Sequence, residues 1–153
     1  MKDNQFIINK MPVPTFRWLK MNEAKLEIPG ELTAYQPSVE GKLPERIEEE
    51  NGFSGSMSTA LDDYFREERL PVQFFALKEG EESPEYIRMH FQNGENAVEH
   101  SAYSFTIEEG ARLKLFLAIE SLEESKNMAF LQEKFHLKKN AKLDLVIAVK
   151  NAK

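Results

Sequence analysis

Hydrophobic and polar residues alternate along the second half of the chain. Between Leu113 and Ile119 every second residue is apolar, and the same alternation returns between Leu143 and Val149. A period of two residues is typical of a strand that buries one of its faces. Helical repeats would instead show a period near 3.6 residues. The pattern therefore predicts strands over this part of the chain.

Three segments repeat one another without gaps. Phe75, Phe105 and Phe135 are spaced by 30 residues, and each is followed two positions later by an aliphatic residue. Two charged residues and a turn former (Gly80, Gly110 or Asn140) come next. A fixed period of this length is the mark of stacked repeats. The other aligned apolar positions are Leu77/Ile107/Leu137, Ile87/Leu117/Ile147, Met89/Ile119/Val149 and Val98/Met128.

The repeat predicts that residues 72–153 are coils of a β-solenoid, with two strands and two turns in each coil of about 30 residues. Aligned residues would form ladders in a common core, with Phe105 between Phe75 and Phe135. The alternative is a β-sandwich or jelly roll with similar hairpins, because Asn93-Gly94, Glu109-Gly110 and Lys139-Asn140 are also turn signals. The equal spacing favours the solenoid.

Residues 1–71 lack the repeat and are predicted to form an N-terminal capping segment with short helices. One helix should begin near Ser56 or Ser58 and end before Pro71. We expect it to cover the first coil, whose edge and core would otherwise be open. Its apolar stripe at helical spacing consists of Met57, Ala60, Leu61, Tyr64 and Phe65.

The remaining N-terminal elements are predicted from turn and helix signals. The segment "LPERIEEENG" indicates a short helix with Pro44 in its first turn and Gly52 beyond its end. Glu31 to Lys42 shows no periodicity and is expected to be a loop or extended linker. Thr15 is expected to cap a short turn that holds Trp18 inward.

Composition narrows the classes of function. The 153 residues carry a net charge of −6, which argues against nucleic acid as a partner. No apolar run is long enough for a membrane span, and the N-terminal apolar stretch is too short for a secretory signal. The chain has no cysteine, so disulfides and thiolate ligands are excluded. We expect a cytoplasmic protein.

Candidate chemistry is sparse, and we expect no enzyme. His90, His100 and His136 have no short metal-ligand spacing. His90 and His136 are predicted to face outward, and His100 to be a hydrogen-bonded core histidine. The charges expected on outward strand faces alternate in sign without a recurring carboxylate pair, and we interpret them as solvated. These charges are Glu99, Lys114, Glu120, Asp144 and Lys150.

Four segments in order carry a family resemblance. "MPVPTFRWLKMNEA", "ALDDYFREE", "VQFFALKEGE" and "NGENAVEH…FTIEEGARLKLFLAIES" together resemble the SufB/SufD family of iron–sulfur cluster assembly proteins, in particular its short SufD-like members. The resemblance implies a right-handed parallel β-helix. It also implies a non-catalytic scaffold in a SufBCD-type complex, with SufB-like and SufC-like ATPase subunits as partners.

The chain departs from this family in its length. It stops at Lys153, about half the family's length, in the middle of a coil, so the late β-helix and the helices that bind SufC have no counterpart. No cluster-site residue of the family is carried over. We therefore expect no cofactor on this chain alone, and an iron–sulfur cluster only in a complex.

The last coil is predicted to be a protein interface. Nothing in this sequence would cover its apolar row, and the strand edge beside that row would be unpaired. Lysines flank the row and guard the edge. We expect partner binding or a two-fold homodimer at this end. The predicted interface residues are Leu143, Leu145, Ile147 and Val149.

Two other functions compete with the scaffold. One is a β-helical or cupin-like enzyme or sugar-binding domain with its site on a strand face. The other is a stand-alone β-domain with a purely structural role.

Overall fold

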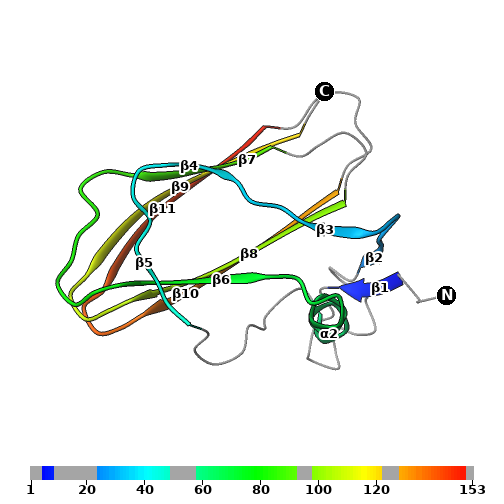
Figure 1. The fold of residues 1–153 in the computed structure, drawn as a ribbon, viewed down its shortest axis with the longest axis horizontal. Coiled ribbons are helices and arrows are strands. Elements are labelled where there is room, and N and C mark those ends of the chain that lie inside the picture. Colours follow the sequence, from blue (N-terminus) through cyan, green and yellow to red (C-terminus); the bar gives the residue numbers. More distant parts are fainter. Residues whose placement is uncertain (1–4, 9–23, 49–57, 93–97, 122–127, 151–153) are drawn as a thin grey trace.

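The computed structural model describes residues 5–8, 24–48, 58–92, 98–121 and 128–150 (Figure 1). These residues form a mainly β structure with one helix. The elements in chain order are β1 Gln5–Ile8, β2 Ala24–Glu27, β3 Leu32–Ala34, β4 Ser38–Glu40, β5 Glu45–Arg46, α2 Thr59–Glu67, β6 Val72–Leu77, β7 Ile87–Gln92, β8 Val98–Ile107, β9 Arg112–Glu120, β10 Met128–Leu137 and β11 Lys142–Lys150.

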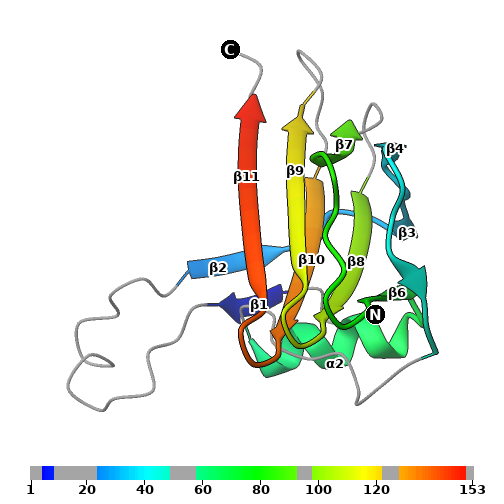
Figure 2. The same ribbon diagram turned by 90° about the vertical axis from the view of Figure 1, so that its left-hand side faces the viewer.

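Two sheets built from alternate strands face each other. The first has the order β10-β8-β6-β5, with β3 beside the first half of β8, and the second has the order β11-β9-β7-β4. The long strands pair in parallel within each sheet, and Figure 2 shows β11 and β9 side by side. Side chains from both sheets, such as Phe105 and Leu117, fill one core between them. The apolar residues of the alternating sequence pattern thus lie in this core.

The predicted ladder through the first sheet is confirmed. Phe105 pairs with Phe75 on one side and Phe135 on the other, and the three rings stack with centroids 5.5 and 5.6 Å apart. The turns that follow these strands also stack on one another. The N–H of Gly80 donates to the carbonyl of Glu109, and the N–H of Gly110 donates to the carbonyl of Lys139. This repetition of contacts explains why the sequence repeats itself.

The turn formers are required by the backbone. Gly80, Gly110 and Asn140 adopt φ values of 71°, 70° and 58°. This left-handed region is open to glycine and tolerated by asparagine, but is unfavourable for most other residues. The predicted turns at Gly110 and Asn140 are therefore confirmed, whereas Asn93-Gly94 lies outside the described residues.

The ungapped alignment of the repeats is wrong for strand β7. Ile87 pairs with Leu115 and Met89 with Leu117, a spacing of 28 residues, whereas β9 and β11 keep the spacing of 30. The shift follows an isolated bridge between Glu82 and Arg112, which still has the spacing of 30. The aligned sets Ile87/Leu117/Ile147 and Met89/Ile119/Val149 are therefore corrected by two residues at their first member.

Ser83 and Pro84 give the physical reason for this shift. The N–H of Ser83 donates to the carbonyl of Arg112 at 3.0 Å, and its Oγ accepts from the N–H of Lys114 at 2.8 Å. Pro84 has no N–H to continue the ladder, so the chain leaves the sheet there. Pairing resumes at Ile87 opposite Leu115, so the segment from Glu82 to Ile87 has two residues more than the segment that it faces. Because side chains alternate with a period of two, this shift keeps every inward residue inward.

Two short strands complete the two sheets beside β7 and β6. β4 pairs antiparallel with β7, and β5 pairs antiparallel with β6. The predicted helix in "LPERIEEENG" is wrong over its described part, because Glu45 and Arg46 join the sheet as β5. The predicted linker from Glu31 to Lys42 contains β3 and β4. An unpaired sheet edge next to these residues outweighs their weak local preferences.

The predicted helix is present as α2, with the predicted cap. The Ser58 hydroxyl accepts from the N–H of Leu61 at 3.2 Å, and the helix ends at Glu67, before Pro71. Leu61 and Phe65 are buried, as the apolar stripe predicts. Met57 lies outside the described residues.

The position predicted for this helix is wrong. α2 packs on the outer face of the first sheet (Figure 1), where Leu61 and Phe65 meet Val98 and Phe130 in a second apolar cluster. Phe6 and Ile8 of β1 join the same cluster. The helix therefore buries the outer face of β8 and β10, while β4 and β5 cover the edge of the first coil.

The long strands do not form the hairpins that a jelly roll needs. β8 pairs in parallel with β6 and β10, and β9 pairs in parallel with β7 and β11. The division predicted at residue 71 stays a prediction, and β3, β4 and β5 belong to the same sheets as the later strands. Thr15 and Trp18 lie outside the described residues. In the described part of the chain, no helix has the length and apolarity needed to cross a membrane.

Candidate functional site

The predicted interface residues lie on the last strand of the second sheet. Leu143 is half-buried, whereas Leu145, Ile147 and Val149 are exposed. All four belong to the inward row of β11, because they pair with the buried row of β9. On its other side β11 has no partner strand among the described residues. An apolar row thus lies beside an unpaired strand edge.

A matching row lies on β10, the last strand of the first sheet. Leu131 and Phe135 are partly buried against the core, and Leu137 is exposed. No described strand pairs with the outer edge of β10 either. We call the surface formed by the two rows the end face. Its residues are Leu131, Glu133, Phe135, Leu137, Leu143, Leu145, Ile147 and Val149.

Glu133 is the one charged residue among the eight that define the end face. It pairs in register with Tyr103, a buried core residue, and lies between Leu131 and Phe135 on the same side of β10. Both carboxylate oxygens are buried and have no hydrogen-bond partner. Burial raises the pKa of Glu133 to about 8. Burial and the neighbouring Glu133 carboxylate raise the pKa of the Tyr103 phenol in turn.

Lysines flank the end face, as the sequence indicated. Lys138, Lys139, Lys142 and Lys150 are all exposed. Lys139 lies 3.6 Å from Glu109 of the preceding turn, and Lys153 lies outside the described residues. Positive charge at the edge and apolar side chains inside it are typical of strands protected against indiscriminate pairing.

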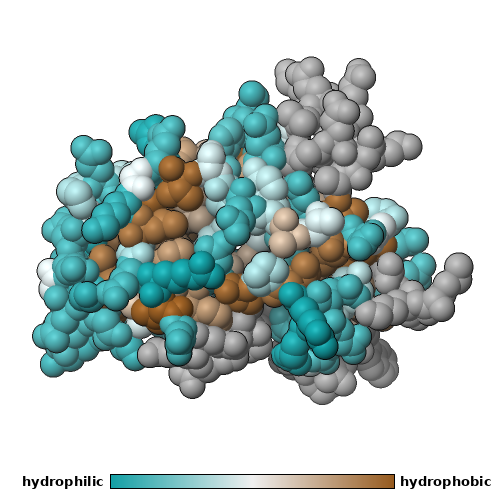
Figure 3. All heavy atoms as spheres, viewed as in Figure 1, coloured by the Kyte–Doolittle hydropathy of each residue, from teal (hydrophilic) through white to brown (hydrophobic). Residues whose placement is uncertain are grey.

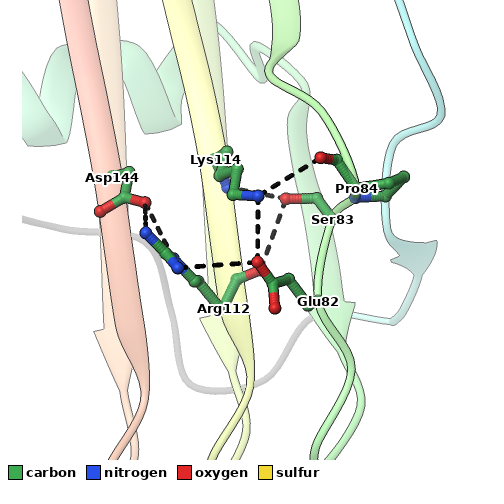
Figure 4. A network of polar contacts seen from close by, with 6 residues as sticks. All are labelled: Glu82, Ser83, Pro84, Arg112, Lys114 and Asp144. Carbon is green, nitrogen blue, oxygen red and sulfur yellow. Dashed lines mark hydrogen bonds and ion pairs between the residues drawn. The ribbon is translucent and has the colours of Figure 1, made fainter.

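A polar network crosses the outer face of the second sheet (Figure 4). The Arg112 guanidinium donates twice to Asp144, at 2.9 and 2.6 Å, and lies 3.7 Å from Glu82. Glu82 also pairs with Lys114 at 3.0 Å. The hydrogen bond and the charge of Lys114, and to a lesser extent the charge of Arg112, hold the pKa of Glu82 low, and Asp144 holds the pKa of Arg112 high. The four side chains neutralise one another and link the β6–β7 loop to β9 and β11.

The predicted strand-face charges do not converge on one site. Lys114 and Asp144 belong to the network above, whereas Glu120 pairs with His90 at 3.2 Å. The outward position predicted for Glu99 is wrong, because Glu99 lies on the side of β8 that carries Tyr103 and Phe105, and one of its oxygens is buried without a partner. Lys150 is exposed at the end of β11. Paired charges on separate faces are poorly placed for general acid–base chemistry.

The histidines also lie apart. His90 and His136 face outward, as predicted. His100 is buried and hydrogen-bonds Gln132 at 2.8 Å, which confirms a hydrogen-bonded buried histidine. It lies under Phe65 of α2, so it belongs to the second apolar cluster. Burial lowers the pKa of His100. Among the described residues, no three His, Asp or Glu side chains are placed to hold a metal ion.

A cleft of about 900 Å³ opens beside the first coil, between the β4–β5 segment and the β6–β7 loop. Leu43, Leu77 and Ile87 line its apolar part, and Tyr86 lies at its rim with charged residues from both segments. Figure 3 shows apolar side chains beside the β4–β5 segment, with hydrophilic side chains around them. No sequence pattern indicated this cleft, because its lining comes from two segments that meet only in the folded chain.

Glu133 was missed at the level of the sequence, although a signal was present. Alternation along β10 places Glu133 on the same side as Leu131 and Phe135. A charged residue in an inward row is unusual unless it is paired. Its significance depends on which groups surround it, and only the structure gives them.

No protein-family profile, curated protein or solved structure matches the chain.

Proposed function

We propose that this chain is a SufD-like, non-catalytic scaffold component of iron–sulfur cluster assembly, which acts by binding a partner protein through its end face. The end face is the observation that carries the proposal. It joins exposed apolar residues, including Leu137 and Ile147, to two unpaired strand edges. Such a surface is typical of an interaction site, because exposed edges and apolar patches both favour association.

The finer fold that we propose is a right-handed parallel β-helix. Parallel pairing at a spacing of 30 residues recurs in both sheets and in the stacked turns, which supports this fold. The covering strands β4 and β5 lie at one end of this stack, and the end face lies at the other. A rigid stack of this kind suits a scaffold, since it holds a binding surface in a fixed shape.

The proposed partners are a SufB-like subunit and, through it, a SufC-like ATPase. The family resemblance in four ordered segments supports both. We propose that the cluster is held in the complex rather than by this chain alone, because cluster iron generally needs thiolate ligands and this chain has no cysteine.

Co-purification tests the proposed interface. The chain is co-expressed with a SufB-like and a SufC-like subunit, and each subunit is followed through affinity and size-exclusion chromatography. Ile147→Lys should abolish co-elution, because it places a charge in the apolar row. Val146→Lys is the matched control, since Val146 is also exposed but points to the other face of β11. Equal co-elution of both variants would contradict the proposal.

Light scattering of the isolated chain tests the two-fold dimer. A dimer that uses the end face should become monomeric with Ile147→Lys, while the circular dichroism spectrum stays rich in β-structure. If the unmutated chain is monomeric at high micromolar concentration, the homodimer is excluded.

Anaerobic reconstitution tests the proposed location of the cluster. We expect the isolated chain to retain no stoichiometric iron and sulfide after gel filtration. Retention of both would overturn the proposal that the cluster is held only in a complex.

The cleft supports a second candidate, a sugar-binding domain. An exposed aromatic ring, Tyr86, lies beside charged groups such as Glu85 and Lys42 at a cavity large enough for a small ligand. Titration with a panel of oligosaccharides, read by amide shifts, tests this function. Shifts at residues 40–45 and 78–88 that Tyr86→Ala removes would support it, and their absence would reject it.

A further inference from the structure

The buried carboxylate in the end face lacks a partner. Glu133 occupies the central part of the inward row of β10, between Leu131 and Phe135, and both of its oxygens are buried without a hydrogen bond. Buried acceptors in proteins are nearly always hydrogen-bonded, because leaving one unsatisfied is costly. A carboxylate at this position therefore indicates a donor that the described part of this chain does not supply.

The surroundings show from which side such a donor can come. β8 lies on one side of β10 and places Tyr103 opposite Glu133, while the phenol supplies no hydrogen bond to it. On its other side β10 has no partner among the described strands. The open edge is therefore the side from which an added strand would pack beside Glu133, and a small turn of the Glu133 side chain would bring its carboxylate to a donor there.

A second copy of this chain fits the charges poorly. A two-fold axis through Glu133 would join β10 to β10 antiparallel and place the two Glu133 side chains against each other, so that neither copy supplies a cation to the other. A two-fold axis through Val146 would place Lys142 of one copy against Lys150 of the other. Like charges directly opposite one another destabilise a strand pair.

We propose that the end face receives an edge strand of a different protein, whose inward row presents a lysine or arginine to Glu133 between apolar residues, and whose flanks are acidic opposite Lys138, Lys142 and Lys150. The inference rests on the proposed function and specifies the chemistry of the partner. The apolar residues on either side of Glu133 supply the contact area. The charge pair selects the correct chain and its register, because a wrong register leaves Glu133 unpaired.

Two peptides of identical composition test the proposal. One has the natural sequence of β10, Met128–Leu137, and the other has Glu133 and Lys134 exchanged, so that its lysine falls in the inward row. Each is labelled, and its affinity for the whole chain is measured by fluorescence anisotropy at neutral pH. Amide shifts along β10 locate the bound peptide. We expect the exchanged peptide to bind about ten-fold more tightly, or better, since a hydrogen bond to a charged group is worth at least that factor.

Variants of the chain identify the residue responsible. Glu133→Leu keeps the row apolar and should bind the two peptides with equal affinity. Glu133→Gln has nearly the same shape without the charge, and should keep only a small part of the preference. Because both variants remove an unpaired buried carboxylate, neither is expected to impair folding. Thermal unfolding of each variant verifies this.

The possible results separate this inference from the proposed function. Equal binding of both peptides to the unmutated chain would overturn the role of Glu133, even if Ile147→Lys still abolished co-purification of the natural partner. Binding of neither peptide, or formation of a homodimer that Glu133→Leu leaves unchanged, would also overturn it. Loss of co-purification with Val146→Lys as well as Ile147→Lys would count against the proposed function alone.

Discussion

The two ends of the strand stack have the same sequence pattern and opposite exposure. At the first coil Leu77 is 8% exposed, and at the last coil its repeat mate Leu137 is 48% exposed. One row of the second sheet shows the same contrast. Met89 and Leu117 are 0% and 1% exposed, while Ile147, which continues their row, is 55% exposed.

The difference arises from what lies against each end. Strands β4 and β5 pair with β7 and β6 and cover the first coil, so its edges are hydrogen-bonded. No described strand does the same for β10 and β11. The same residue type therefore stabilises the core at one end, as Leu77 does, and forms an exposed apolar surface at the other, as Leu137 does.

The largest expected effect is at the middle of the ladder. Phe105→Ala should lower the free energy of unfolding by about 3–5 kcal/mol, the usual range for a buried phenylalanine. Phe116→Ala should cost much less, because Phe116 lies on the outer face beneath Arg88. Chemical denaturation of both variants measures the difference. Comparable losses would mean that β9 is buried on both faces.

A matched pair along one row tests the two ends directly. Met89→Ala should cost about 2–5 kcal/mol, since the side chain is fully buried. Ile147→Ala, in the same row at the open end, should cost less than about 1 kcal/mol. Urea titrations of both variants at equal protein concentration provide the measurement. A large loss at Ile147 in dilute monomeric protein would show that the end face is covered.

The pH dependence of stability should reveal the unpaired carboxylate. Burial raises the pKa of Glu133 from 4.5 to about 8, so the folded chain retains a proton that the unfolded chain releases in between. The contribution of Glu133 to the free energy of unfolding is therefore fully present below pH 4.5 and is lost as the pH rises to about 8. Glu133→Gln should lack this decline, with a difference on the order of a few kcal/mol at pH 8. Parallel curves for the two proteins would contradict the burial of Glu133.

The smallest effect is expected in the polar network on the outer face. Arg112→Gln removes the ion pairs with Asp144 and Glu82, whose side chains are 34% and 52% exposed. The cost should stay below about 1 kcal/mol and shrink further in high salt. Thermal unfolding at low and high ionic strength measures it. A loss of several kcal/mol would make the network a main support of the stack.

The ladder and the turns could be predicted from the sequence because they depend on neighbours at a fixed spacing. Phe75, Phe105 and Phe135 stack as their alignment indicated, and Gly110 and Asn140 adopt the predicted turns. The helix cap at Ser58 was equally local. Each of these features requires only a few nearby residues or an exact repeat, and both are visible in the chain.

Of the two rows that form the end face, the sequence predicted the one on β11. The apolar row of β11 follows from alternation and from its place in the last copy of the repeat. Glu133 in the row of β10 followed from the same alternation, but its lack of a hydrogen-bond partner depends on every group around it. Sequence position alone does not specify such a surrounding.

The sequence by itself determined the strands, their inward faces and the stacking of most repeat positions, because these follow from a period of two within a strand and of 30 between strands. Tertiary structure alone decided the two-residue shift after Ser83, the conversion of Glu45–Arg46 into a strand and the place of α2. In each case a long-range demand outweighed a weak local preference. Unpaired strand edges and an uncovered apolar face cost more free energy than the local conformations that would have left them open.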